Sequence, residues 1–420
     1  MDAAKQHRRL LSFSVWSLVC SACLPFEAPA EKPDGEEESD TQCNGKDDFE
    51  TCTLRTQPDY PYDICVSERC VSPGCGDAHC NVPGPGFPLP DTNLRRCYND
   101  DAEMPCPAAS DAEYFGQDAQ YGLDTTYTDP ETERFQKRGT ANEPIVADHI
   151  TGLDWQGCLP DTYGDRCQDG HTVYYEWGGA LQMCRDLSWG GYSDWRLPDI
   201  YSLLTLVNMG AEAGATYTEL FAQDTGAVLW STTTHPGDKT FAFTVVFDAH
   251  PRVSYEVKTF VEEDTETDET DVSVRCVRGD ATAHGDRFHR ENGALVTDTI
   301  TGLIWQGCAD ARERPPCVGE EDGTMDWRGA LAYCEQRAFG GKTDWRLPSA
   351  MELFSIVNTR DEKLMVSSPS NGDRIAPGYW TSTTSASSAS EAWVVSFRDG
   401  SGQFIGKGAE FRVRCVRDAY

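Results

Sequence analysis

The stretch Gly190-Gly191-Tyr192-Ser193-Asp194-Trp195-Arg196-Leu197-Pro198 recurs as Gly340-Gly341-Lys342-Thr343-Asp344-Trp345-Arg346-Leu347-Pro348. The second copy begins 150 residues after the first, at 340 instead of 190. Residues on both sides repeat at this offset: Thr151-Gly152-Leu153 and Thr301-Gly302-Leu303, Trp155 and Trp305, Trp177 and Trp327, Ala180 and Ala330, Leu181 and Leu331, Cys184 and Cys334, Leu203 and Leu353, and Val207 and Val357. A spacing kept over so many positions indicates a duplicated domain.

This duplication sets the domain organisation that we expect. A chain of 420 residues favours two to three domains, and a repeat of about 130–150 residues can enclose its own hydrophobic core. The expected segments are a signal peptide at 1–22, an acidic tether at 23–42, a Cys-rich segment with a Pro/Gly-rich spacer at 43–96, a first domain at 97–280 and a second domain at 281–420.

The charge of the chain excludes one large class of partners. The formal net charge is −33 at pH 7. Binding to nucleic acid requires a surface rich in Lys and Arg that neutralises phosphates, so we expect no nucleic-acid partner. The same charge disfavours sulfated glycans and other anionic polymers.

Eighteen cysteines indicate an oxidising compartment. Ten of them lie between residues 1 and 106, including Cys97 and Cys106, which are close enough to close one small loop. Each repeat holds four: Cys158, Cys167, Cys184 and Cys276 in the first, and Cys308, Cys317, Cys334 and Cys415 in the second. Without Cys20 and Cys23 the number is even, as a disulfide framework requires.

The N-terminus predicts export. Basic residues precede a short apolar run from 10 to 19, and small residues follow it, which is the pattern of a secretory signal peptide. Small residues before Cys23 also resemble a bacterial lipobox, so Cys23 is the expected lipidation site; the alternative is simple cleavage and release. The acidic stretch 27–40 has the composition of a disordered tether. We therefore expect a secreted protein, held at the outer membrane or cell surface as a lipoprotein.

Within each repeat the periodicity predicts an α+β domain. Trp177, Ala180, Leu181 and Cys184 follow helical spacing, as do their counterparts at 327–334, and the paired glycines are expected to end this helix. Pro198 and Pro348 are expected to open a second helix as its first residue. Predicted strands lie at 146–148, 151–155, 230–233, 241–247 and 272–278, with counterparts at 296–305, 380–383, 393–397 and 411–417. The acidic run 262–271 is expected to be a solvated hairpin tip.

These landmarks resemble the Legionella collagen-like protein C-terminal (Lcl C-terminal) domain family over residues 140–279 and 290–418. The resemblance rests on Thr-Gly-Leu-x-Trp, the Trp-x-x-Ala-Leu helix with its cysteine, Asp-Trp-Arg-Leu-Pro and the closing Val-Arg-Cys-Val-Arg. More distantly, the repeats are similar to the C-type-lectin-like fold of formylglycine-generating-enzyme-type domains. That fold implies disulfides Cys184–Cys276 and Cys334–Cys415, which leaves Cys158–Cys167 and Cys308–Cys317 as local loops.

The motif residues themselves are expected to be scaffold, since buried aromatics dominate cores. Asp194 and Arg196, like Asp344 and Arg346, are interpreted as a structural ion pair or as a guanidinium bound to the backbone. Function is expected on loops that differ between the copies, because binding residues concentrate on loops. Those loops are 209–228 against 359–378 and 248–271 against 398–408, and Trp189, Phe339 and Tyr192 are the candidate exposed anchors.

The sequence favours a binding protein over an enzyme. It holds no Gly-x-Ser-x-Gly, His-Glu-x-x-His or glycine-rich phosphate loop, and only eight histidines. We expect no catalytic residues and no cofactor, with calcium left open, and a carbohydrate or protein ligand at the cell surface that an adhesin-like protein would bind. The membrane is expected as a partner only through the lipid anchor, and the oligomeric state is not predicted. The alternatives are a structural envelope lipoprotein that docks a protein partner and, ranked below it, a hydrolase or formylglycine-generating-type enzyme.

Overall fold

The structure is a computed structural model. It describes the strands β1 (Thr51–Cys52), β2 (Asp63–Val66) and β3 (Arg69–Val71), and then residues 89–121, 134–164, 166–212, 216–217, 220–259, 271–279, 288–291, 295–299, 301–307, 324–357, 359 and 378–419. All described residues belong to one compact unit, Gln42–Tyr420. The predicted signal peptide, Cys23, the tether, residues 262–270 and the pair Cys308 and Cys317 lie outside the described residues.

The two repeats share one order of main elements, which is three strands, two helices, three further strands and a closing strand. The first holds β6 (Phe135–Gly139), β7 (Pro144–Asp148), β8 (Asp154–Gln156), β9 (Thr162–Tyr163), β10 (Asp169–Gly170), α2 (Trp177–Asp186), α3 (Ile200–Leu204), η3 (Ala222–Asp224), β11 (Val228–Thr234), β12 (Phe241–Val246), β13 (Arg252–Val257), β14 (Val272–Ser273) and β15 (Val277–Arg278). The second holds β16 (Phe288–Glu291), β17 (Leu295–Asp298), β18 (Leu303–Gln306), α4 (Trp327–Glu335), α5 (Ala350–Ser355), β19 (Tyr379–Thr384), β20 (Glu391–Val395), β21 (Gly402–Gly406) and β22 (Val416–Asp418). The described residues are thus mostly β-sheet with a few short helices.

A four-stranded sheet joins the two ends of each repeat. Its strand order is β15-β8-β7-β6 in the first repeat and β16-β17-β18-β22 in the second. The predicted strand pair around the Thr-Gly-Leu turn is present as β7 and β8, with Val146 opposite Trp155. The closing strand β15 pairs with β8, with Val277 opposite Trp155, and the closing strand β22 pairs with β18, with Val416 opposite Trp305. Each repeat therefore begins and ends in one sheet.

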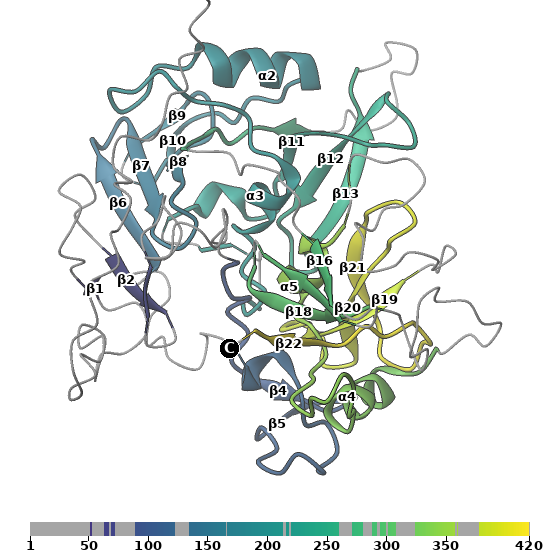
Figure 1. Ribbon diagram of the computed structural model, residues 1–420. Coiled ribbons are helices and arrows are strands. Elements are labelled where there is room, and N and C mark those ends of the chain that lie inside the picture. The colour runs from purple at the N-terminus through teal and green to yellow at the C-terminus, as the bar shows by residue number, and fades with distance from the viewer. Residues whose placement is uncertain are drawn as a thin grey trace, which may run out of the picture. The chain divides into compact units, whose positions relative to one another are not determined.

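A single seven-stranded sheet runs through both repeats, in the order β14-β11-β12-β13-β21-β20-β19. Figure 1 shows β13 of the first repeat beside β21 of the second, where Val253 pairs with Gly402. Gly402 has no room for a side chain, because an added Cβ would lie 2.7 Å from the indole of Trp393. Residues 248–271 and 398–408 were predicted to be loops, but they supply the two strands that join the repeats, β13 and β21. The predicted loop conformation is wrong for these strand residues, and the expected functional role of the segments stays a prediction.

The largest hydrophobic cluster is also shared between the repeats. It includes Leu203 of α3 and Leu353 and Phe354 of α5, all at most 1% exposed. The Tyr201 and Phe354 rings are 5.9 Å apart between centroids, and the Tyr201 hydroxyl donates to the Val357 carbonyl oxygen. Two smaller clusters belong to one repeat each and surround its long disulfide. Because burial of apolar surface drives folding, the shared cluster binds the two repeats into one cooperative body.

The helices begin and end at residues that differ from the predicted ones. The helix α3 begins after Asp199, whose side chain accepts a hydrogen bond from the Ser202 amide, and α5 begins after Ser349 in a capping box with Glu352. Pro198 and Pro348 therefore precede the N-cap instead of opening the helix. The paired glycines do not end α2 or α4: Gly190 and Gly191 form a tight turn with φ of 59° and 83°, values that favour glycine.

The predicted strand at 272–278 is broken in the middle. Residues 274–276 form no ladder, so β14 belongs to the large sheet and β15 to the small one. Arg275 is fully buried at this break, where its Nη2 atom lies 2.6 Å from Asp224 Oδ1. Burial raises the pKa of Asp224, and the guanidinium of Arg275 opposes that rise. The side chains on both sides of this stretch are therefore buried, instead of alternating between a core and solvent.

Candidate functional site

Disulfides hold each repeat at the point where its small sheet closes. Cys184 of α2 is bonded to Cys276, and Cys334 of α4 is bonded to Cys415, with Cα–Cα distances of 5.4 and 5.5 Å. Local loops are closed by Cys158–Cys167 and Cys97–Cys106. These are the pairs that the resemblance implied, together with the small loop expected at 97–106.

The Asp-Trp-Arg motif is scaffold, but its ion pairs differ from the predicted ones. Asp194 binds Arg278 of the closing strand, with 2.8 Å between Oδ1 and Nε, and the guanidinium of Arg278 holds the pKa of Asp194 below its usual range. Asp344 binds Arg417 in the same way. In the second repeat, Arg346 of the motif binds Glu352 and Asp418 instead of Asp344. The motif therefore fastens the glycine turn to the end of the repeat.

The three candidate anchors are placed differently. Phe339 is only 7% exposed and packs against Trp345, so it is not an exposed anchor. Trp189 is partly exposed, and its Nε1 atom donates to the Pro144 carbonyl. Tyr192 is 42% exposed, with the guanidinium carbon of Arg278 3.7 Å from its ring centroid. Only the first repeat thus presents aromatic groups beside its glycine turn.

Residues 97–121, which the sequence assigned to the first domain, contact the second repeat. This segment contains β4 (Cys97–Tyr98), β5 (Glu103–Met104) and η1 (Asp118–Gln120), and Figure 1 shows β4 and β5 next to α4. The Tyr121 hydroxyl donates to Glu335 of α4 at 2.5 Å, and Thr383 of β19 donates to Asp118 at 2.5 Å. We call residues 89–121 the strap, because they contact the first repeat through Thr92 and Asn93 and then lie against the second repeat.

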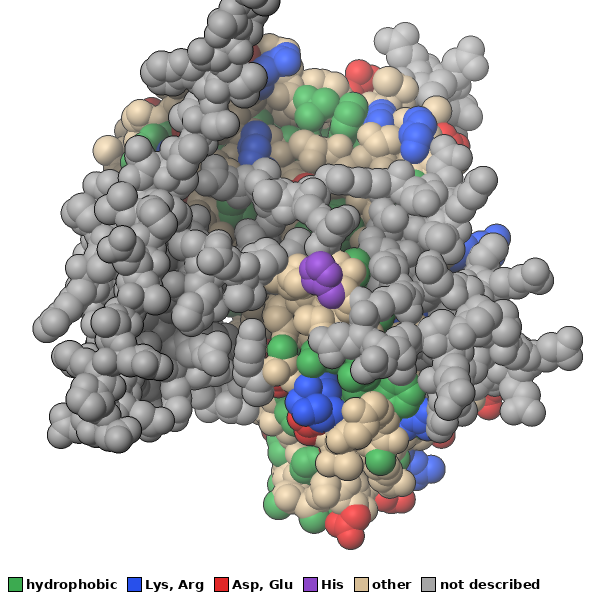
Figure 2. Space-filling model, in the orientation of Figure 1, with side chains coloured by type: hydrophobic (Ala, Val, Ile, Leu, Met, Phe, Trp, Pro, Cys, Tyr) green, Lys and Arg blue, Asp and Glu red, His purple; other side chains and the backbone are tan. Residues whose placement is uncertain are grey.

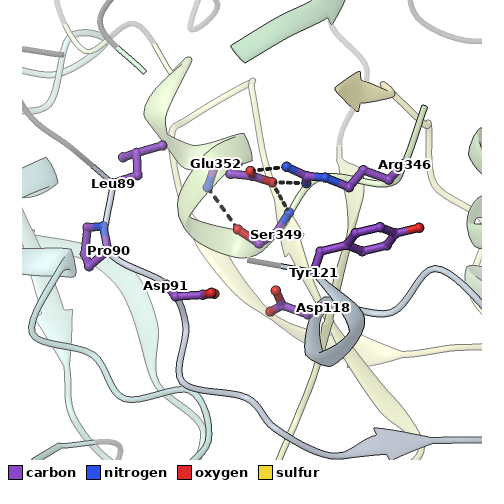
Figure 3. Close-up of a pocket in the computed structure, with 8 residues that line it drawn as sticks. All are labelled: Leu89, Pro90, Asp91, Asp118, Tyr121, Arg346, Ser349 and Glu352. Atoms are coloured by element: carbon purple, nitrogen blue, oxygen red, sulfur yellow. Dashed lines mark hydrogen bonds and ion pairs between the residues drawn. The ribbon is translucent and has the colours of Figure 1, made fainter. Parts of the chain in front are cut away.

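The strap and the second repeat enclose a small pocket, which Figure 3 shows from inside. It is lined by Leu89, Pro90, Asp91, Asp118, Tyr121, Arg346, Ser349 and Glu352. Its volume of about 90 Å³ is well below the roughly 300–1,000 Å³ of ordinary ligand pockets. The pocket is therefore smaller than an ordinary ligand pocket and lies where the two segments meet.

The polar groups in this pocket bind one another. Arg346 makes two hydrogen bonds to Glu352, of 2.6 and 2.7 Å, and a third to Asp418. Burial opposes the charge of Glu352, but Arg346 holds its pKa below the usual range. Asp118 Oδ2 accepts hydrogen bonds from Thr92 and Thr383, while burial and then the charge of Asp91 raise the Asp118 pKa to about 7.

A second feature occurs in both repeats and was missed from the sequence. In α2 and α4 the first helical residue is a tryptophan with a lysine over its ring: Lys258 Nζ lies 4.0 Å from the Trp177 ring centroid, and Lys407 Nζ lies 3.9 Å from that of Trp327. Burial lowers the pKa of Lys407 to about 7. The signal that was available is spacing, since the lysines follow their tryptophans by 81 and 80 residues.

The described residues contain no group of three or more His, Cys, Asp or Glu side chains placed to hold a metal ion. In the described part of the chain no helix has the length and apolar character needed to cross a bilayer. Basic and acidic side chains are interspersed on the described surface in Figure 2, instead of forming a field of one sign.

These features define a class: a duplicated, disulfide-bonded, mostly β domain whose helix is tied to its closing strand. A family model for the Lcl C-terminal domain matches residues 144–278 and 294–417, so the chain belongs to the Lcl C-terminal domain family. The tandem arrangement expected from the 150-residue offset is confirmed by the two matches. No curated protein sequence matches this chain.

Proposed function

We propose that this protein is a non-enzymatic, adhesin-like binding protein of the cell surface. A signal peptide at 1–22 would export it, and a lipid on Cys23 would hold it at the outer membrane or cell surface. Four disulfides support an oxidising compartment. Disulfides from a helix cysteine to the closing segment support the C-type-lectin-like fold as the finer description of each domain.

One observation carries the proposal: among the described residues, the large hydrophobic side chains that are exposed all lie in the first repeat. They are Tyr163, Tyr174 and Tyr192, which are 50%, 47% and 42% exposed. Tyrosines with an apolar ring and a polar tip are common at binding surfaces, where they offer contact area at low entropic cost. The second repeat has Lys342 in place of Tyr192 and Thr324 in place of Tyr174. The first repeat is therefore the binding domain, and the second repeat supports it.

The chemistry of the enclosed pocket favours binding over catalysis. Catalytic groups need contact with a substrate, but Asp118 is 4% exposed, and both of its hydroxyl partners come from the protein. Arg346 is likewise bound to two carboxylates. The pKa of Asp118 near 7 is thus explained by the burial of its carboxyl between the strap and the second repeat.

A carbohydrate is the first ligand to test, because exposed tyrosine rings stack on sugars. The experiment is a glycan-array screen of the disulfide-intact chain from residue 24, with and without calcium, comparing the wild type with Tyr192→Ser and Tyr174→Ser. Lys342→Ser in the second repeat is the matched control. Binding that both tyrosine variants lose and the control keeps would support the proposal.

The outcome also decides the alternative. A clean negative at high protein density would exclude carbohydrate recognition and leave the second candidate, a lipoprotein that docks a protein partner. Binding that depends equally on both repeats would contradict the assignment of binding to the first.

A further inference from the structure

The corner between α2 and β13 has the same construction as the corresponding corner of the second repeat. The Trp177 amide donates to the Lys258 carbonyl at 3.1 Å, as the Trp327 amide does to the Lys407 carbonyl at 3.0 Å. The indole Nε1 atoms donate to the carbonyls of Ser231 and Thr381, both at 2.8 Å. The two corners are therefore equivalent in backbone, indole and ammonium group.

In the second repeat the strap covers this corner. Lys407 Nζ donates to the main-chain carbonyl of Asn99 at 2.9 Å, and the Tyr114 ring centroid lies 6.4 Å from that of Trp327. Tyr114 has a φ of 64°, which is uncommon for a residue other than glycine and directs this turn of the strap. At the start of the helix, Arg328 Nη1 lies 3.6 Å from the Glu113 carboxylate. Trp327 and Lys407 are consequently 0% and 3% exposed.

In the first repeat the same groups are more open. Trp177, Leu181 and Lys258 are all partly exposed, although the counterpart of Leu181, Leu331, is fully buried. Lys258 Nζ donates to Thr234 of its own repeat at 2.8 Å. At Gly178, the counterpart of Arg328, an added Cβ would meet nothing within 4 Å.

The charge at this corner indicates what would bind there. Burial and then the nearby positive charge of Lys239 lower the pKa of Lys258, so two cations adjoin each other in a chain of net charge −33. An acidic group would be attracted to these two cations, as Glu113 is to Arg328. One face of the Trp177 ring already carries Lys258, so that face is not open for stacking on a sugar.

From this comparison we infer that the α2 corner, formed by Trp177, Gly178, Leu181 and Lys258, docks an acidic polypeptide segment of a partner protein. The segment presents a main-chain carbonyl to Lys258, an aromatic ring to the exposed part of Trp177 and a carboxylate near residue 178, as the strap does on the second repeat. The inference goes beyond the proposed function, because it concerns a second surface of the first repeat, apart from the exposed tyrosines, and a ligand of another class.

The probe is a fluorescent peptide of residues 95–121, closed by the Cys97–Cys106 disulfide, titrated into the full-length chain and followed by anisotropy. Two substitutions at one position give the sharpest test, because Gly178 is exposed, has open space around it and lies in a helix, where both Arg and Glu are more favourable than Gly. Gly178→Arg should tighten binding about threefold, since it restores the partner of Glu113, and Gly178→Glu should weaken it about threefold.

Larger losses of peptide affinity are expected when the counterparts of Trp327 and Lys407 are removed from the α2 corner. Trp177→Ala and Lys258→Met should each weaken peptide binding by roughly tenfold, as expected for a contact at the centre of an interface. Lys342→Ser is the control, because it removes an exposed cation of the second repeat, outside the α2 corner, and its affinity should equal that of the wild type. Thermal melting of each variant excludes unfolding as the cause.

The inference is overturned if the peptide does not bind, or if it binds with the same affinity to both Gly178 variants. Self-association of the full chain that depends on Trp177, measured by sedimentation, would replace the partner protein with a second copy and would equally refute it. Failure of the peptide to bind would leave the proposed function standing, since that function is tested on the exposed tyrosines with glycans.

Discussion

The helices α2 and α4 carry the same four core-facing residue types at the same positions, but they bury them to different extents. In α4 the residues Trp327, Ala330, Leu331 and Cys334 are all buried, whereas in α2 only Ala180 and Cys184 are. The sequences of the two helices do not explain this difference in burial. The strap explains it, because in the contacts described above the strap touches α4 and does not touch α2. Duplication yields two equivalent surfaces, and a segment that is not duplicated makes them unequal.

The largest expected effect is the loss of stability when a long disulfide is removed, and it tests whether this disulfide stabilises the two repeats equally. Replacing both cysteines of Cys184–Cys276 or of Cys334–Cys415 with Ala should cost about 2–5 kcal/mol of unfolding free energy in either repeat. The bonds span 92 and 81 residues, and loop-closure entropy depends on length only logarithmically, so the two losses should agree. Urea unfolding measures them. A difference larger than about 1 kcal/mol would show that the shared core protects one repeat more than the other.

The next effect belongs to the strap alone. Because the folded-state pKa of Asp118 is raised from 3.8 to about 7, the folded state favours the neutral acid. Stability that is present below pH 4 should be lost as the pH rises towards 7, by roughly 2–4 kcal/mol, and stay level above that. Asp118→Asn should remove this slope in urea unfolding between pH 4 and 7.5. Thr383→Val, which deletes a hydroxyl that favours the ionised form, should move the loss to a higher pH; an unchanged profile in both variants would contradict the assignment.

Lys407 and Lys258 give the next prediction, in which stability changes by a smaller amount and in the opposite direction with pH. The folded-state pKa of Lys407 is lowered from 10.5 to about 7 by burial, so the folded state disfavours the ammonium. Stability should rise as the pH increases from 7 to 9, by about 1–3 kcal/mol. Lys407→Met should abolish this rise, and Lys258→Met should leave it almost intact because Lys258 is partly exposed and the strap does not cover it. Equal slopes in the two variants would mean that the strap does not distinguish the corners.

The smallest expected effect concerns the aspartates of the repeated motif. Asp194→Ala and Asp344→Ala each remove an ion pair to the closing strand, but both carboxylates are 59% exposed. Exposed pairs contribute about 0–1 kcal/mol, so the melting temperature should fall by no more than a few degrees in either variant. A much larger fall in one repeat would show that its glycine turn depends on the pair.

The sequence predicted the parts of this fold that depend on neighbouring residues. The helix at 177–184 follows from apolar spacing, and the strand pair around Gly152 follows from the turn between two apolar runs. The capping box of Ser349 and Glu352 was also readable from the Ser-x-x-Glu pattern, although it was missed in favour of Pro348. The signal for each of these features lies within a few residues.

What the sequence did not predict depends on distant partners. The break at 274–276 allows Arg275 to reach Asp224, which is 51 residues away, and no periodicity reports such a pair. The contact between Asp118 and Thr383 spans 265 residues and has no counterpart in the duplication. The exposed groups of the first repeat follow from where the strap lies, so the candidate site could be located only after the strap was placed.

The position of the strap also determines how the protein would carry a pulling force. A lipid-held protein that grips a ligand is stretched between its N-terminus and its binding face. A pull arriving at residue 89 would first load the hydrogen bonds of Thr92 and Asn93 with Met209 and Asn208 of the first repeat. It would then load the contacts of Asn99, Asp118 and Tyr121 with the second repeat. The strap would thus divide the tension between the two repeats, so that neither repeat would carry the whole load.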